Sequence, residues 1–423
     1  MKQSTNKEII KALNKVSPIS MQEHQLPVVW AKAKDYTVTD IEGKTYIDFT
    51  SSIFVANSGH SNTDILNAMR KKLNQELIHS YTFATKIRLK FLQELTSFTG
   101  YDKAFLLSSG TEAVEAACKI MKWYGLQKWA KSMARDSSSV VKAETSTGLS
   151  PKKHIIYSIA GSMHGKSMLA EQLKCNGTSL TGINDSIINL PYPKNGDKFL
   201  SPLSGSNVCG IFLESYRGWN AELLPIPYVQ SLMKWAKDND VLVCFDEIQA
   251  GFGRTGKLFA YEYYKIRKPD LVCCGKGLGG GVPISAVLGR KELLDLPDDL
   301  SSTNSGNPLV CAAALANIEY IKTYNLIKKS YDLGRILNKR LGEISQKYDI
   351  ITGYNSIGLV GALIFANELL ASSVCYKAMN KGLLLVKTGR ESIKIGPPLV
   401  ITKSALLEGL DIVEKSIKES NKS

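Results

Sequence analysis

A single lysine stands among glycines in the stretch DLVCCGKGLGGGVP (270–283). Lys276 follows a short apolar run, where a lysine is a poor neighbour because its ammonium group resists leaving water. In a closed, partly desolvated site the same side chain is biased toward the neutral amine, which is nucleophilic and forms Schiff bases with aldehydes. The alternative is a surface lysine with its charge in water, which fits the strand end and the flanking glycines poorly.

Two adjacent carboxylates end another apolar run, in VLVCFDEIQAGFGRTG (241–256). Asp246 and Glu247 point to opposite faces if this run is a strand. A carboxylate at the carboxyl end of a strand in an α/β sheet lies where ligands usually bind. The alternative is an acid that caps the following turn, and Gln249 with the glycine-rich stretch after it weighs against that interpretation.

A third stretch, SSGTEAVEAA (108–117), reads as a strand end, a turn of small residues and the start of a helix. Backbone N–H groups at a helix N-terminus bind anions, and glycine permits close approach. Gly110 and Thr111 are therefore candidate phosphate ligands. The alternative is a plain helix cap made by Ser109 or Thr111.

These three pieces match the needs of one cofactor. A helix N-terminus holds a phosphate, Asp246 protonates a basic ring nitrogen, and Lys276 holds an aldehyde. Pyridoxal 5′-phosphate has all three groups, and its chemistry needs an acid at the ring nitrogen.

The elements that position these residues alternate along the chain. Short runs that bury both faces are typical of central strands in a mostly parallel sheet, and helical patterns separate them. The strands are expected at 103–109, 154–160, 209–215, 241–247 and 270–276. This order predicts an α/β fold with crossover helices. The polar stretch 125–153 is expected to be a surface loop.

Composition and length divide the chain further. We expect residues 1–50 to pack with the small domain, residues 51–307 to form a large cofactor-binding domain, and residues 308–423 to form a smaller α+β domain. The formal charge is +14, but no nucleic-acid-binding motif accompanies it. No membrane span, secretory signal or metal-binding spacing is visible, and the unpaired cysteines fit a cytoplasmic protein.

Several stretches in register resemble the class III pyridoxal-phosphate aminotransferases of fold type I. They include SSGTEA, MHG, FDEIQAGFGRTG, PDLVCCGKGLGGGVP, TNSGNPLVCAAALA and IGPPLVIT, and they span most of the chain. The resemblance implies a large domain with a mostly parallel central sheet and a small α+β C-terminal domain. It also implies a homodimer with shared active sites.

The resemblance assigns roles to individual positions. Lys276 is the expected Schiff-base lysine, Asp246 the partner of the pyridine nitrogen, and Gln249 the neighbour of the phenolic oxygen. The other expected cofactor contacts are Gly110, Thr111, Met163 and His164. Thr303 is expected to reach the phosphate of the cofactor bound in the partner subunit.

Some positions depart from the family pattern. Met163 stands where an aromatic residue usually stacks on the cofactor, and Arg217 replaces a common glutamine. Lys394 replaces an arginine that commonly grips a substrate carboxylate. We therefore expect Glu214, Arg217 and Lys394 to shape the substrate site, although Arg217 can instead neutralise Glu214 in a structural pair.

The predicted activity is transfer of an amino group from a small-molecule donor to a carbonyl acceptor, by a ping-pong mechanism through pyridoxamine phosphate. The donor is expected to be glutamate or an ω-amine. Two alternatives stay open: an aminomutase or decarboxylase of the same fold, and a non-enzymatic basic binding protein.

Overall fold

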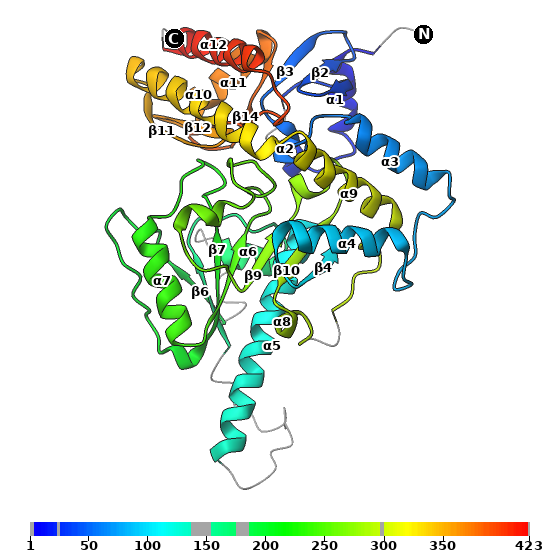
Figure 1. The fold of residues 1–423 in the computed structure, drawn as a ribbon. Helices are drawn as coiled ribbons and strands as arrows, with labels where there is room; N and C mark the ends of the chain where they lie inside the picture. Colours follow the sequence, from blue (N-terminus) through cyan, green and yellow to red (C-terminus); the bar gives the residue numbers. More distant parts are fainter. Residues whose placement is uncertain (1–3, 23–25, 137–153, 175–185, 297–299, 422–423) are drawn as a thin grey trace.

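The structure is a computed structural model that describes residues 4–22, 26–136, 154–174, 186–296 and 300–421. A large unit with a central sheet lies below a smaller unit with its own sheets (Figure 1). The helices of the described chain are α1 (Asn6–Leu13), α2 (Ser51–Phe54), α3 (Thr63–Leu73), α4 (Lys86–Thr99), α5 (Gly110–Asp136), α6 (Met168–Lys174), α7 (Ile226–Asp238), α8 (Lys291–Leu294), α9 (Pro308–Thr323), α10 (Leu326–Lys347), α11 (Glu368–Asn380) and α12 (Lys403–Ser420).

The central sheet has seven strands. Their order is β4 (Lys103–Leu107), β10 (Ser285–Gly289), β9 (Leu271–Cys274), β8 (Leu242–Asp246), β7 (Val208–Glu214), β5 (Ile155–Ile159) and β6 (Ile187–Leu190). Strand β10 pairs antiparallel with both neighbours, and the pairings from β9 to β6 are parallel. The predicted mostly parallel sheet is confirmed.

Both faces of this sheet are covered. Side chains of Leu242 and Cys244 pack on the side of α5, while Val243 and Phe245 belong to the core on the opposite side with α7. Alternation along a strand sends neighbouring residues to opposite faces, so an apolar run without polar breaks is what this double covering requires.

Helix α5 is longer than the sequence pattern indicated. It runs to Asp136 and projects beyond the sheet (Figure 1), so the expectation of a loop over 125–153 is wrong for its first part. The residues Leu126 to Arg135 are mostly good helix formers, which explains the continuation beyond the packed turns. Residues 137–153 lie outside the described part.

The smaller unit contains two sheets. Strands β11 (Ile351–Ile357), β12 (Val360–Phe365), β15 (Ser392–Ile395) and β14 (Val386–Lys387) form one antiparallel sheet. The other joins β1 (Trp30–Lys34), β2 (Thr37–Asp40) and β3 (Thr45–Asp48) to β13 (Leu383–Leu384). Strand β13 pairs in parallel with β3, so the two ends of the chain share a sheet.

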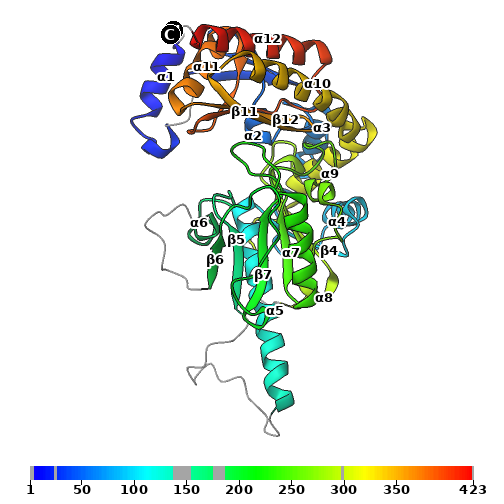
Figure 2. The same cartoon turned by 90° about the vertical axis from the view of Figure 1, so that its left-hand side faces the viewer.

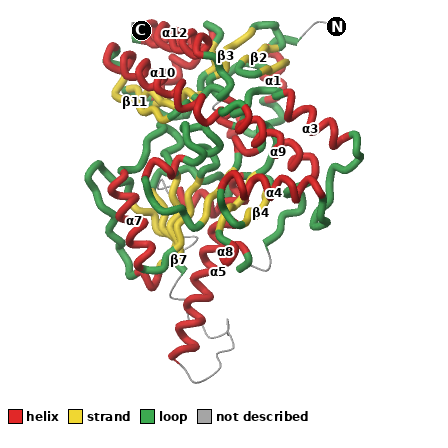
Figure 3. Tube along the Cα trace, viewed as in Figure 1, coloured by secondary structure: helices red, strands yellow, loops and turns green. Residues whose placement is uncertain are grey.

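The helices α10, α11 and α12 lie on the outer side of β11 and β12, away from the large unit (Figure 2). Mostly loops lie between the two units (Figure 3). Helix α9 packs against α3 and α4. In the described residues, no helix is both long and apolar enough to cross a bilayer.

Candidate active site

One cavity of about 230 Å³ brings together most residues that the sequence singled out. It lies where β8 and β9 end and α5 begins. The predicted residues in its walls are Gly110, Thr111, Met163, His164, Glu214, Asp246, Gln249 and Lys276. Segments far apart in the sequence thus place an amine, two carboxylates and a helix N-terminus around one space.

Lys276 is half-buried and begins a short 3-10 turn after β9, with a φ of 40°. This left-handed conformation is uncommon outside glycine and needs support from its surroundings. Asn317 of α9 supplies it, because its Nδ2 donates to the carbonyls of Gly277 and Leu278, both at 2.8 Å. Ser58 in turn donates to Asn317 Oδ1 at 2.6 Å.

Burial lowers the pKa of the Lys276 ammonium below its ordinary value, and the negative charges of Asp246 and Glu214 oppose that shift. Desolvation disfavours the charged form of an amine. The cavity therefore favours the free amine more than bulk water does.

Asp246 ends β8 and faces the cavity. The backbone N–H of Ile248 donates to its Oδ1 at 3.0 Å, and His164 Nδ1 contacts its Oδ2 at 2.8 Å. Each carboxylate oxygen has a second lone pair. Asp246 is thus held in place and can still accept a hydrogen bond from a donor in the cavity.

Glu247 points the other way, as strand alternation predicted. Its carboxylate accepts hydrogen bonds from Ser215 Oγ at 2.5 Å and from the N–H groups of Ala260 and Tyr261 at 2.9 and 2.8 Å. Burial raises the pKa of Glu247 to about 8. This acid organises the scaffold behind the cavity, so adjacent carboxylates serve different purposes.

Glu214 ends the neighbouring strand β7 and holds the segment that carries Met163. Its Oε2 accepts the Met163 N–H at 3.1 Å, and the Met163 side chain, 40% exposed, lines the cavity. Burial raises the pKa of Glu214 to about 7, and the nearby charge of Asp246 adds to the shift. Glu214 thus changes charge near neutral pH.

The start of α5 combines both interpretations of SSGTEA. Ser109 Oγ accepts the N–H of Glu112 at 3.3 Å, and Glu112 Oε2 accepts the N–H of Ser109 at 2.7 Å, which makes a cap. Within the described part of the chain, no acceptor contacts the N–H groups of Gly110 and Thr111. They remain available to an anion in the cavity.

Three predicted residues do not line this cavity. Thr303 is exposed, and its carbonyl accepts a hydrogen bond from His79 Nε2 at 2.9 Å. Arg217 lies 3.2 Å from the centre of the Tyr192 ring and pairs with Glu222 at 3.3 Å. The alternative interpretation, a structural pair of Arg217 with Glu214, is therefore wrong, because the acidic partner of Arg217 is Glu222.

Lys394 is the third. It lies in β15 and is only 2% exposed. Its Nζ donates to the carbonyl of Gly218 and to Gln249 Oε1. It thus lies directly behind a residue of the cavity wall.

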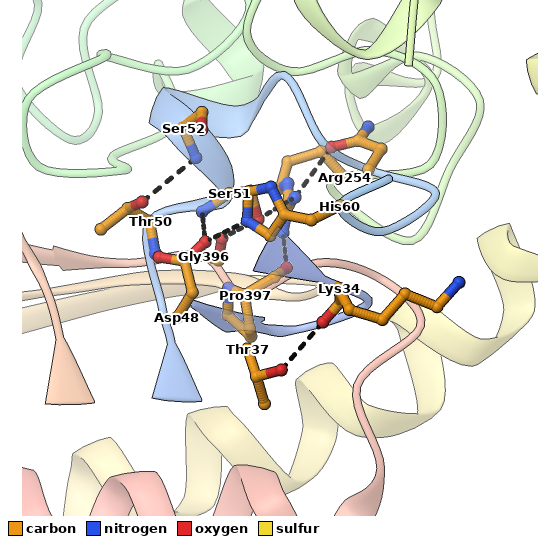
Figure 4. Close-up of polar contacts among 11 residues, drawn as sticks. Lys34, Thr37, Asp48, Thr50, Ser51, Ser52, His60, Arg254, Gly396 and Pro397 are labelled. Atoms are coloured by element: carbon orange, nitrogen blue, oxygen red, sulfur yellow. Dashed lines mark hydrogen bonds and ion pairs between the residues drawn. The ribbon is translucent and has the colours of Figure 1, made fainter. Parts of the chain in front are cut away.

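Arg254 is a buried cation that sequence reasoning missed. Its Nη1 donates to the carbonyls of Leu359 and Pro397 at 3.0 and 2.6 Å, and its Nη2 donates to Asn57 Oδ1 at 2.8 Å (Figure 4 shows its surroundings). Burial lowers the pKa of Arg254 to about 10. Arg254 stands among glycines in GFGRTG, as Lys276 does in its own stretch. This shared pattern was the sequence signal for a buried cation.

The turn α2 beside Arg254 is left-handed, with φ between 46° and 68° from Ser51 to Phe54. Asp48 accepts the N–H groups of Thr50 and Ser51 at 2.8 and 2.9 Å and pairs with His60 at 2.7 Å (Figure 4). Ser51 Oγ also donates to the Gly396 carbonyl at 2.6 Å. These bonds hold an unfavourable turn, which places Phe54 against β15.

The residues around the cavity fit pyridoxal phosphate. An amine is present for its aldehyde, a buried carboxylate for its basic nitrogen, and free N–H groups at a helix start for its phosphate. Gly165 allows the MHG segment to lie close to α5, because a Cβ there would overlap the Thr111 hydroxyl.

Comparison with known proteins agrees with this assignment. The sequence matches the family described as aminotransferase class-III over residues 19–417. It is 31% identical to the ornithine aminotransferase of Saccharomyces cerevisiae, with 98% of each chain covered. It is 30% identical to the acetylornithine aminotransferase of Methanocaldococcus jannaschii, with 93% of this chain and 95% of that one covered.

Solved structures give the same result. The acetylornithine aminotransferase of Elizabethkingia anophelis has a TM-score of 0.80 at 27% identity, covering 98% of this chain and 100% of that chain. The predicted family, fold, cofactor and reaction type are thereby confirmed. The chain belongs to the class III aminotransferases, pyridoxal-phosphate-dependent enzymes of fold type I that transfer amino groups.

Proposed function

We propose that Lys276 binds the aldehyde carbon of pyridoxal phosphate and moves the proton during amino transfer, while Asp246 keeps the ring nitrogen protonated. The observation that supports this assignment is that Lys276, Asp246 and the N-terminus of α5 line one cavity. When bound, the cofactor supplies an aldehyde and an electron-withdrawing ring.

The other wall residues have binding roles in this proposal. The N–H groups of Gly110 and Thr111 donate to the phosphate, and Met163 packs on a face of the ring. His164 orients Asp246 through the bond between Nδ1 and Oδ2. Gln249 donates to the phenolic oxygen of the ring.

Lys276 acts as the base in this scheme. A general base works best when its pKa lies near the operating pH, and burial shifts the pKa of Lys276 in that direction. Once a substrate amine has taken its place, the free amine of Lys276 accepts a proton from the carbon beside the substrate nitrogen and later returns it.

For the substrates, we propose a donor with a terminal primary amine and a small carbonyl acceptor, with glutamate serving the other half-reaction. One observation supports this: the relatives named above are ornithine and acetylornithine aminotransferases.

The test is a panel of amines given one at a time to the enzyme with bound cofactor, without acceptor. Terminal amines and glutamate should discharge the visible absorbance, and other α-amino acids should do so slowly. Uniformly fast α-amino acids with inert terminal amines would contradict the donor class. Release of carbon dioxide, or turnover without any acceptor, would instead identify a decarboxylase or an aminomutase.

We further propose a homodimer with shared sites. Exposed apolar side chains gather at the end of α3, in the following loop and on α4: Leu73, Leu77, Ile78, Tyr81, Phe83 and Leu89. His79 of this loop contacts the Thr303 carbonyl, so Thr303 lies beside that surface. A second copy would bury these residues and bring Thr303 to the partner's cofactor phosphate.

Subunit mixing tests this arrangement. Lys276→Ala and Thr303→Ala homodimers should each have low activity. After verified exchange, a hybrid contains one site with both changes and one with neither, so activity should return. Verified exchange without recovery would rule out a shared site.

We also propose that the protein works in the cytoplasm. All seven described cysteines are free and buried, which suits a reducing compartment.

A further inference from the structure

We propose that Lys394 is a positioning residue that fixes the orientation of the Gln249 amide, and that it does not bind a substrate carboxylate. This inference rests on the proposed function, since the oriented amide would face the cofactor.

The surroundings of Lys394 leave no open direction toward the cavity. Its Nζ donates to Gln249 Oε1 at 2.5 Å and to the Gly218 carbonyl. The same nitrogen lies 4.4 Å from the centre of the Phe54 ring and 5.5 Å from that of Tyr216. Two acceptors and two aromatic rings thus enclose the group, as a buried lysine requires.

The strand that carries Lys394 is itself held on both sides. Lys394 pairs with Ala362 of β12 and Val386 of β14. Immediately after it, the carbonyls of Gly396 and Pro397 accept bonds from Ser51 and Arg254 (Figure 4). Lys394 therefore cannot move toward the cavity by a simple displacement of its backbone.

Gln249 shows what this arrangement achieves. Its Oε1 accepts from Lys394 Nζ and also from the Tyr216 hydroxyl at 3.0 Å. The Tyr216 hydroxyl can also accept a bond, but an ammonium can only donate and an amide nitrogen cannot accept, so Lys394 fixes which way the amide lies. No described residue accepts from Gln249 Nε2, which leaves this N–H donor for the cavity that Gln249 lines.

The ammonium form of Lys394 is the one that fixes the amide, because it has N–H donors and no lone pair. Burial lowers its pKa well below the ordinary value and the nearby charge of Lys276 adds to the shift, while the charge of Glu214 opposes it. A neutral amine keeps N–H donors for Gln249 and Gly218 but has a lone pair as well, so it holds the amide less strictly. A carboxylate clamp, by contrast, needs a cation with free donors, and an arginine supplies them in a planar fork.

The test uses the enzyme with bound cofactor and no substrate. The visible absorbance is titrated with pH, because a donor at the phenolic oxygen favours its ionised form. Lys394→Met removes the donor behind Gln249 and lets the side-chain amide rotate by half a turn, so that Nε2 no longer faces the cavity. The midpoint should rise by about one pH unit, the usual size of one hydrogen bond to a charged group.

Gln249→Ala should raise the midpoint similarly, and the double variant should rise no further, because both changes remove one donor. Lys394→Gln keeps an N–H donor and should shift the midpoint less than the methionine variant. If Lys394→Met does not fold, the Lys394→Gln variant is used to measure the midpoint in its place.

An unchanged midpoint in the lysine variants, with a raised KM only for substrates that carry a carboxylate, would overturn this inference in favour of a clamp. Additive shifts in the double variant would also overturn it. The proposed function fails separately, if the wild-type protein binds no cofactor or shows no visible absorbance.

Discussion

Two lysines lie within reach of each other's charge beside the same cavity, and they differ in what surrounds them. Lys276 lines the cavity in a left-handed turn, with carboxylates near it. Lys394 lies behind the wall, and its nitrogen is bonded to oxygens of Gly218 and Gln249. Burial lowers the pKa of both amines.

The difference shows that burial alone does not make a lysine reactive. Desolvation biases both side chains toward the free amine, but only the one with unoccupied space in front of it can reach a ligand. A lowered pKa marks a candidate, and the hydrogen-bond partners decide between a reacting group and a support.

Lys276→Ala gives the largest expected effect. Removal of the base and of the covalent anchor should lower kcat by on the order of 10⁴-fold, the upper range for one acid–base group. Steady-state rates and the mass of the protein after borohydride reduction measure it. Wild-type protein should retain the cofactor covalently at Lys276, and the variant should not. A label on another lysine would contradict the assignment of Lys276 as the reacting lysine.

Asp246→Asn should lower kcat by about 10²–10³-fold while the folded protein persists, because an amide cannot stabilise a protonated ring nitrogen. Glu247→Gln is the matched control in the adjacent position. It should mainly lower the free energy of unfolding, by about 1–3 kcal/mol, since its buried hydrogen bonds lose an acceptor. Equal kinetic losses in both variants would show that Asp246 is also part of the scaffold.

Glu214→Gln should have the smallest effect, and it should depend on pH. Folding raises the pKa of this carboxyl from 4.5 to about 7, so the folded protein binds the proton more tightly than the unfolded chain. Wild-type stability from this group is present below pH 4.5 and is lost as pH rises through about 7.

The glutamine variant lacks this dependence. Its Tm relative to that of the wild type should therefore rise with pH across this window, by an amount equivalent to about 3 kcal/mol. A parallel pair of Tm profiles would show that the environment of Glu214 is less desolvated than its burial indicates, and that Glu214 carries its full negative charge near both lysines at neutral pH.

The sequence predicts the parts of the site that depend on local pattern. Alternation in VLVCFDE separates Asp246 from Glu247, and apolar runs without polar breaks indicate strands covered on both faces. Glycines around Lys276 mark a lysine in a crowded place. Each of these signals lies within about ten residues of the group it describes.

Other features depend on partners far away in the chain. Asn317 supports the Lys276 turn and Arg254 joins three segments, but no local pattern shows either contact. The partners of Lys394 likewise come from distant residues, so its contacts with Gly218 and Gln249 could not be predicted from a local pattern. The length of α5, by contrast, could have been predicted from the sequence, because its outer turns are rich in helix-forming residues.

The sheet shared by the two chain ends also sets an order of events during synthesis. Ser51 and Gly396, joined across the small unit, are 345 residues apart in the chain. At about 5–20 residues per second, the partners of the N-terminal strands leave the ribosome roughly 20–70 s later. Throughout that interval β3 has an unpaired edge, so the N-terminal sheet is completed only after the cofactor-binding unit has been made.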